Sequence, residues 1–125
     1  MKVLVCGGRD YDDQMHVYIN LDRIHADTPI RYLLNGGATG ADSLGKRWAQ
    51  NRGVQPVTCD ALWDFWGRMN NKRRAGPERN AAMLGLGPDL VVAFPGGSGT
   101  AGMVRLAKAA GVEVIECLAS SDEVK

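Results

Sequence analysis

The sequence predicts an α/β fold of the Rossmann-like type, a three-layer sandwich with one parallel sheet of about five strands. Short apolar runs alternate with segments of helical length along the chain. Glycine-rich turns directly follow three of these runs. Strands that alternate with helices pair in parallel through right-handed crossovers, and we expect the strand order 3-2-1-4-5. Ligands bind such sheets beyond the carboxyl ends of the strands, where the strand order reverses.

The bulk composition indicates one domain. The chain has 125 residues, and we assign 1–119 to a single domain and 120–125 to a polar C-terminal tail. The formal net charge of +1 argues against a general electrostatic affinity for nucleic acid or membranes. No apolar run approaches the roughly 20 residues of a membrane span, and we find no signal peptide. Three widely spaced cysteines favour free thiols and a cytoplasmic location.

The first strand and helix follow from an apolar run and a helical repeat. The run Lys2–Cys6 predicts a buried strand, and Asp12 or Asp13 can cap the helix after it. Thr28 and the following proline end that helix. Its apolar residues at helical spacing are Met15, Tyr18, Leu21 and Ile24.

The second strand is expected at Arg31–Asn35, followed by a glycine-rich turn and a second helix. That helix extends to about Arg52, and Gly53 stops it. Its inward residues are predicted to be Leu44, Trp48 and Ala49. The third strand, Val54–Cys59, is expected at an edge of the sheet because Pro56 interrupts it.

The second half of the chain supplies two more helices and two more strands. Gly76-Pro77 opens a helix, since proline is favoured in the first turn. The apolar run Leu90–Phe94 has the length of a covered parallel strand. An amphipathic helix follows the next glycine cluster, and the last strand is Val112–Cys117. The inward face of that helix is predicted to comprise Val104, Ala107 and Ala110.

Three glycine clusters are predicted to meet at the carboxyl edge of the sheet. They follow the first, second and fourth strands and comprise Gly7-Gly8-Arg9, Gly36-Gly37-Ala38-x-Gly40-x-Asp42 and Gly96-Gly97-Ser98-Gly99-Thr100. Glycines let the backbone approach a ligand closely. A helix that begins after such a cluster offers free N–H groups and the positive end of its dipole, which together favour phosphate. The clusters therefore predict a nucleotide site.

Individual roles follow from side-chain chemistry. The Ser98 and Thr100 hydroxyls and the N–H groups around them are expected to hold the phosphate, and Arg79 can add a charge-assisted contact. Arg79 can also be a surface charge. Asp42 can accept hydrogen bonds from ribose hydroxyls or cap the second helix. Tyr11 can stack on a base or pack over its loop.

These motifs, in this order, resemble the SLOG superfamily of SMF/DprA and Lonely Guy proteins, and most closely its YspA-type, YpsA-related branch. The resemblance spans nearly the whole chain. It rests on Gly7-Gly8-Arg9-Asp10-Tyr11, on the second glycine cluster, and on Pro95-Gly96-Gly97-x-Gly99-Thr100. It implies nucleotide binding and homo-oligomerisation.

Lonely Guy proteins hydrolyse the N-glycosidic bond of nucleoside 5′-monophosphates. Their pattern has an Arg-Lys pair before PGGxGT and glutamates after it. Here Arg79 matches the arginine, Asn80 stands at the lysine position, and Ala101-Gly102-Met103 follows Thr100 without a glutamate. Cleavage of this bond needs a carboxylate near the ribose, so Asp10 is the substitute catalytic candidate, together with Arg79. A local contact between Asp10 and its neighbour Arg9 is the alternative.

A second hypothesis is single-stranded nucleic-acid binding. The segment Trp63–Arg74 combines aromatic and basic side chains, which is how single strands are held. Other members of the superfamily bind single-stranded DNA. The alternative is a basic surface segment whose aromatic residues close the site or an oligomer interface.

A third hypothesis is a non-catalytic sensor of NAD or ADP-ribose-type ligands. Residues 97–102 match GxGxxG, and Glu116 lies where a dinucleotide fold places its ribose acid. Residues 40–46 match the GxxxxGK phosphate loop, but Gly45-Lys46 is expected inside a helix, so we reject that motif. His16 and His25 are isolated. We therefore expect no metal and no cofactor.

Overall fold

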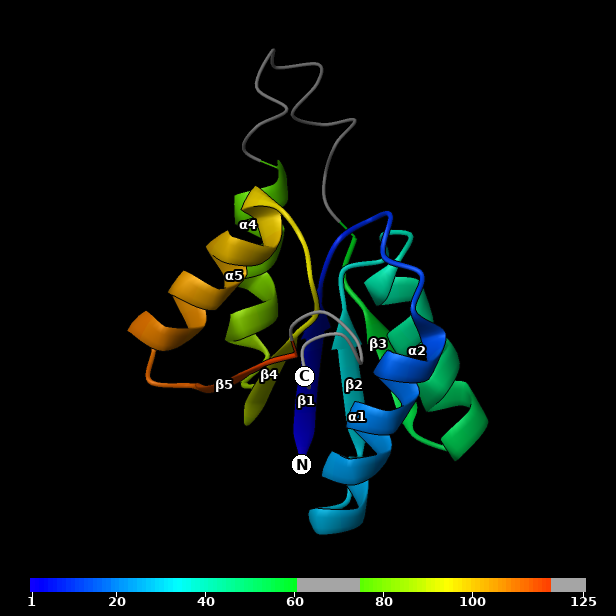
Figure 1. The fold of residues 1–125 in the computed structure, drawn as a ribbon. Helices are drawn as coiled ribbons and strands as arrows, with labels where there is room; N and C mark the ends of the chain where they lie inside the picture. Colours follow the sequence, from blue (N-terminus) through cyan, green and yellow to red (C-terminus); the bar gives the residue numbers. More distant parts are fainter. Residues whose placement is uncertain (61–74, 118–125) are drawn as a thin grey trace, which may run out of the picture.

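Alternating apolar runs and helical segments form a layered α/β structure in a computed structural model, which describes residues 1–60 and 75–117 (Figure 1). The elements in these ranges are β1 (Lys2–Cys6), α1 (Gln14–Asp27), β2 (Tyr32–Asn35), α2 (Ala41–Arg52), β3 (Gln55–Thr58), α4 (Ala75–Gly85), β4 (Leu90–Ala93), α5 (Ser98–Ala109) and β5 (Glu113–Glu116). The strand order is β3-β2-β1-β4-β5, and every neighbouring pair is parallel. The predicted fold class and strand order are confirmed.

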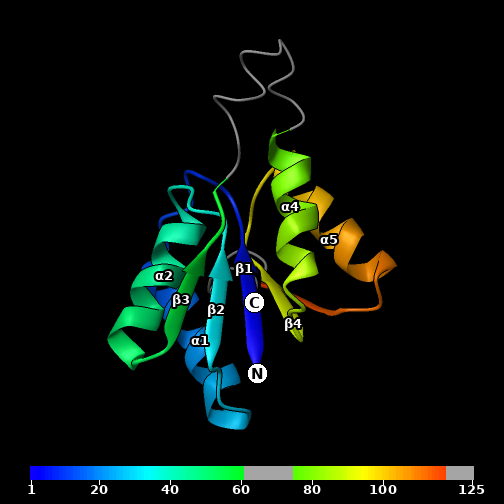
Figure 2. The ribbon, with the colours of Figure 1, turned by 180° about the vertical axis from the view of Figure 1, so that it is seen from behind.

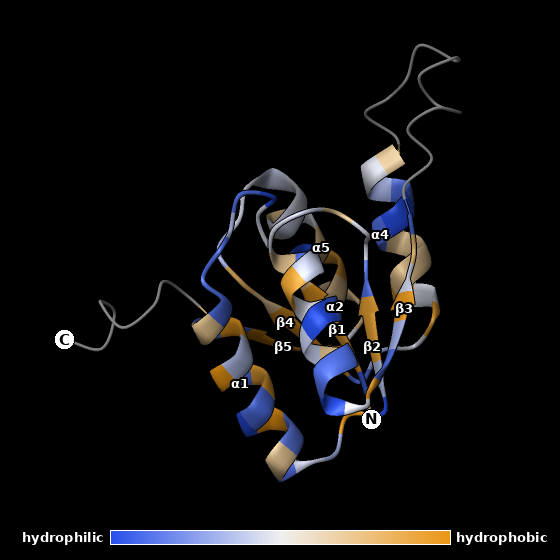
Figure 3. Ribbon diagram, turned by 90° about the vertical axis from the view of Figure 1, so that its right-hand side faces the viewer, coloured by the Kyte–Doolittle hydropathy of each residue, from blue (hydrophilic) through white to orange (hydrophobic). Residues whose placement is uncertain are grey.

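Helices cover the sheet on both faces. Helices α1 and α2 lie on one face, and α4 and α5 lie on the other, as the view from behind shows (Figure 2). Successive side chains of a strand point to opposite faces, so Val3 and Val5 pack toward α1 and α2 while Leu4 packs toward α4 and α5. Figure 3 shows the apolar strands enclosed between helices of mixed polarity.

Local signals set the helix ends as the sequence predicts. Asp13 is the N-cap of α1, and its side chain accepts a hydrogen bond from the N–H of His16 at 3.0 Å. Gly53 ends α2 in the left-handed conformation, with φ of 70°. The strand β3 lies at the edge of the sheet, as Pro56 indicates.

Two details of the helical faces differ from the prediction. Met15 is 72% exposed, and Val17 takes its place in the core of α1. On α5, Met103 is buried, whereas Ala110 lies beyond the helix and is exposed. Both differences arise because a helical stripe defined by spacing alone has an uncertain phase until its neighbours are known.

A polar contact joins α1 to α2. Asp22 accepts hydrogen bonds from Trp48 Nε1 at 2.8 Å and from Arg52 Nε and Nη2 at 2.8 and 2.9 Å. The Arg52 guanidinium lies over the Tyr18 ring, 5.3 Å from its centroid. The hydrogen bonds from Arg52 and Trp48 hold the pKa of Asp22 below its ordinary value.

Candidate functional site

The three glycine clusters meet at the carboxyl edge of the sheet, at its upper end in Figure 1. The N–H of Gly8 donates to the carbonyl of Pro95 at 2.8 Å, which joins the β1–α1 loop (residues 7–13) to the β4–α5 loop (residues 94–97). The N–H of Ala41 donates to the carbonyl of Gly8 at 3.1 Å, which joins the β2–α2 loop (residues 36–40) to the first. The predicted convergence of the clusters is confirmed.

Only the first part of the third glycine cluster forms a loop, because α5 already begins at Ser98. Gly97 is the N-cap, and it has no side chain that could cap the first turn. The first helical hydrogen bond runs from Ala101 N to Gly97 O at 3.0 Å. The N–H groups of Ser98, Gly99 and Thr100 precede that bond, so the helix supplies them no acceptor. Ser98 and Gly99 are exposed.

The glycines of the site fall into two groups. A Cβ on Gly96 would meet the Thr100 hydroxyl and the backbone of Gly8, and a Cβ on Gly40 would meet the carbonyls of Gly8 and Arg9. These glycines are required by close packing of the loops. Gly97 and Gly99 are different: a Cβ on either would have nothing within 4 Å, and neither has a positive φ. Packing within the described residues therefore does not explain glycine at these two positions.

Asp42 supports the β2–α2 loop from within α2. Its Oδ2 accepts hydrogen bonds from the N–H groups of Gly36 and Ala38, both at 3.2 Å. The side chain is buried, and burial raises the pKa of its carboxyl, an effect opposed by the Ala38 hydrogen bond and the Arg79 charge. The N-cap of α2 is Gly40, so of the two roles weighed for Asp42 the alternative of an N-cap is wrong.

Arg79 lies between the glycine loops. Its Nη1 donates to the carbonyl of Gly36 at 2.8 Å, and its Nε donates to Asn80 Oδ1 at 3.1 Å. Asn80 is buried, and its Nδ2 donates to the carbonyl of Gly99 at 3.3 Å. The alternative of a surface charge therefore does not describe Arg79, which is half-buried and reaches the β2–α2 loop.

Sequence reasoning missed one residue of this edge, Asn35. It is 1% exposed at the end of β2, where its Oδ1 accepts from the N–H of Gly37 at 2.9 Å. Its Nδ2 donates to the carbonyl of Val57 at 3.4 Å. The available signal was an amide side chain closing an apolar strand directly before a glycine turn.

The β1–α1 loop contributes Arg9 and Asp10, which are both exposed. Tyr11 packs on Phe94, with ring centroids 5.8 Å apart and planes at 26°, so the packing role weighed for Tyr11 describes its ring. Burial is the main reason that the pKa of Tyr11 rises to about 12. Its hydroxyl has no hydrogen-bond partner among the described residues.

The structure also bears on the other motifs that the sequence suggested. Gly45 and Lys46 lie inside α2, and Gly45 packs against Val5, so the GxxxxGK match is no phosphate loop. Glu116 is exposed, and its carboxylate lies 3.6 Å from Lys108 Nζ. The segment Trp63–Arg74 lies outside the described residues. Within the described ranges, no group of three metal-ligating side chains gathers.

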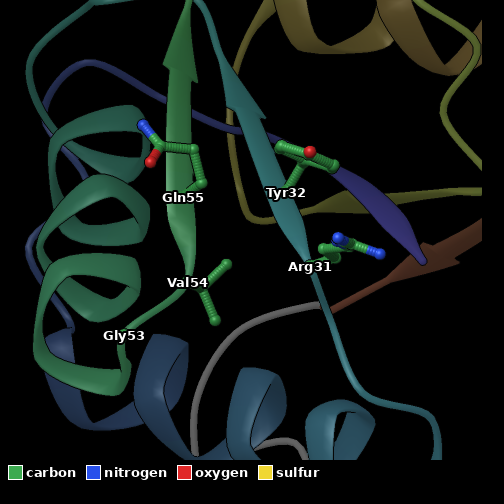
Figure 4. Close-up of a pocket in the computed structure, with 5 residues that line it drawn as sticks. All are labelled: Arg31, Tyr32, Gly53, Val54 and Gln55. Atoms are coloured by element: carbon green, nitrogen blue, oxygen red, sulfur yellow. The ribbon is translucent and has the colours of Figure 1, made fainter.

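A separate hollow of about 420 Å³ lies at the opposite, amino edge of the sheet (Figure 4). It is lined by the first residues of β2 and β3 and their flanking residues: Arg31, Tyr32, Gly53, Val54 and Gln55. The Arg31 guanidinium lies 6.0 Å from the centroid of the Tyr32 ring. The sequence analysis did not predict this hollow.

The parallel sheet and the joined glycine loops define a Rossmann-like α/β protein with its candidate site at the carboxyl edge. The chain belongs to the YspA, cpYpsA-related SLOG family, whose model matches residues 1–65. The predicted resemblance is confirmed. Gene 61 protein of Mycobacterium phage D29 is 34% identical over 122 residues, covering 91% of this chain and 94% of that protein.

A solved structure supports the fold. DNA processing protein A (DprA) from Streptococcus pneumoniae superposes with a TM-score of 0.54 at 16% sequence identity. The match covers 91% of this chain but 58% of DprA, so the chain spans less than two thirds of that protein. At this identity the similarity concerns the fold. No helix in the described ranges is long and apolar enough to cross a membrane.

Proposed function

We propose that this protein binds a nucleotide or nucleotide-derived small molecule at the carboxyl edge of its sheet, with a phosphate at the first turn of α5. The N–H groups of Ser98, Gly99 and Thr100 and the two hydroxyls would hold the phosphate oxygens. The β2–α2 loop, one strand away from β1, would face the sugar. Membership of the SLOG family supports this proposal.

The observation that carries the proposal is a pair of glycines, Gly97 and Gly99, whose Cβ positions face open space at the start of α5. Alanine is favoured over glycine by roughly 1 kcal/mol inside a helix, yet Gly99 lies in α5 with free space around it. Gly97 has the same free space at the N-cap. A ligand that approaches the backbone closely accounts for both, because a side chain would occupy its place.

The test is mass spectrometry after incubation of the purified protein with a panel of nucleoside 5′-monophosphates, NAD and ADP-ribose. We expect at least one of these ligands to be retained by the wild-type protein and lost in Gly97→Val. Gly102→Val is the matched control, since Gly102 lies in the same helix one turn further on. Absence of saturable binding to the whole panel would overturn the proposal.

The same experiment separates binding from chemistry. Hydrolysis would break the C1′–N bond, add water to C1′ as a hydroxyl, and leave a proton on the released base. Free base with the wild type but not with Asp10→Asn would extend the proposal to N-glycosidic hydrolysis with Asp10 as its carboxylate. Intact ligand alone would make this protein a binding module.

A further inference from the structure

A continuous path of hydrogen bonds joins the first turn of α5 to the first turn of α2. It runs from Gly99 O to Asn80 Nδ2, through the Asn80 amide to Arg79 Nε, and from Arg79 Nη1 to Gly36 O. Gly36 N then donates to Asp42 Oδ2. The four bonds measure 3.3, 3.1, 2.8 and 3.2 Å. Both ends of the path lie at the proposed ligand site.

The path runs beyond the carboxyl ends of the strands, where strand pairing does not fix the geometry of the loops. The β4–α5 and β2–α2 loops follow strands on either side of β1, so they are two strands apart. Asn80 is 6% exposed and Asp42 is 7% exposed, so water competes little for these hydrogen bonds. The backbone joins these two loops only indirectly, through Gly8, and the side chains of Arg79 and Asn80 therefore add a second connection between them.

We propose that Arg79 and Asn80 are positioning residues, which set the spacing between the first turn of α5 and the β2–α2 loop. This inference rests on the proposed function, since spacing matters for a ligand that contacts both loops. A nucleotide has its phosphate and its nucleoside at opposite ends, and both ends must fit at once. Loss of the path weakens binding of the whole nucleotide and leaves binding of an isolated phosphate unchanged.

Arginine is suited to this role by its shape. Its Nε and Nη1 donate to two acceptors from one rigid plane, whereas a lysine ammonium is a single point charge on a flexible stem. Arg79→Lys therefore keeps the positive charge and breaks the link. This substitution separates positioning from a direct charge contact with phosphate.

The experiment measures affinities for AMP, adenosine and inorganic phosphate by calorimetry. Asn80→Ala removes two hydrogen bonds of the path and Arg79→Lys removes at least one, and each variant is expected to weaken AMP binding about fivefold. Inorganic phosphate should bind either variant within about twofold of the wild type. Equal losses for AMP and phosphate would overturn the proposal, as would unchanged AMP affinity. Asn51→Ala is the control, because Asn51 donates a side-chain hydrogen bond to Tyr18 in the α1–α2 contact, away from the path.

A second readout needs no ligand and so stands if the proposed function fails. We expect the Gly36 and Ala38 amides to exchange hydrogen faster in Asn80→Ala, although Asn80 touches neither of them. Changes confined to residues 97–100 would overturn the positioning role. Asn80→Asp keeps the acceptor for Arg79 and loses the donor to Gly99, so it should weaken AMP binding while Gly36 keeps its protection. This variant also serves if Asn80→Ala does not fold.

Discussion

The carboxylate of Asp42 accepts a hydrogen bond from the backbone N–H of Gly36 at 3.2 Å, so a residue of α2 holds the end of β2 in place. The same oxygen accepts from Ala38. The loop that precedes α2 is thus stabilised by the helix that follows it.

Substitutions of Asp42 should separate its hydrogen bonds from its charge. Asp42→Ala leaves two loop N–H groups without their acceptor and should cost about 1–3 kcal/mol of folding free energy. Because burial raises the folded-state pKa of Asp42, its contribution to stability is full below the unfolded pKa of about 3.9 and is lost as pH rises through the folded pKa. Asp42→Asn should remove that loss. Urea unfolding between pH 4 and 8 measures both effects, and a parallel pH dependence of wild type and Asp42→Asn would contradict them.

The Asp22 contact should show the opposite pH dependence. Hydrogen bonds from Arg52 lower the folded-state pKa of Asp22, so its contribution is present above the unfolded pKa and is lost as pH falls through the folded value. Asp22→Asn should therefore cost about 1 kcal/mol at pH 7 and progressively less below pH ~4. Thermal unfolding at both pH values tests this, with the exposed Asp27→Asn on the same helix as control. A cost that is independent of pH would refute the assignment.

Two alanine substitutions in α5 should differ in their effect on binding. Gly99→Ala and Gly102→Ala both add a Cβ without a close contact, so each should stabilise the protein by up to about 1 kcal/mol. Under the proposed function, Gly99→Ala also lowers ligand affinity, whereas Gly102→Ala does not. Unfolding curves and AMP titrations of the pair check the prediction. Equal affinities would show that glycine at 99 serves no ligand.

A second glycine pair contrasts a crowded position between the loops with an open one at a helix end. Both have a positive φ, but Gly53, with φ of 70° and ψ of 22°, is in the left-handed helical region, whereas Gly40, with φ of 73° and ψ of −129°, lies outside it, so alanine is strained at both and more strongly at Gly40. A Cβ at Gly40 would also overlap the Gly8 carbonyl, whereas a Cβ at Gly53 meets nothing within 4 Å. Gly40→Ala should therefore be clearly more destabilising than Gly53→Ala in urea unfolding. Similar costs would mean that the loops can separate.

The Tyr11 hydroxyl is buried without a partner among the described residues, which costs stability. Tyr11→Phe keeps the ring on Phe94 and removes this group, so we expect a gain of up to about 1 kcal/mol. Phe94→Leu is the contrasting change, since it removes the stacking partner and should destabilise. Differential scanning calorimetry compares the variants. A loss of stability in Tyr11→Phe would reveal a hydrogen bond made by its hydroxyl.

Much of the fold was predictable because it depends on local periodicity. The bounds predicted for β1 match those observed, and each of the other predicted strands is one residue longer than the observed strand at one or both ends. Asp13 and Gly53 act at the helix ends as their chemistry predicts. It was harder to predict which face of an exposed helix is buried. Met15 shows the reason, because an apolar residue at helical spacing is buried only if a neighbouring element covers it.

The sequence by itself determined the layered fold, the family and the edge at which the three glycine clusters meet, since apolar periodicity and glycine turns are local properties. Only the tertiary structure decided what individual polar residues do there. From the sequence alone, the charges of Asp42 and Arg79 are interpreted as ligand contacts. In the folded chain, Asp42 accepts hydrogen bonds from Gly36 and Ala38. Arg79 donates to Gly36 and Asn80. Hydrogen bonds between residues up to 43 positions apart depend on the packing of α4 against the loops, which no local pattern records.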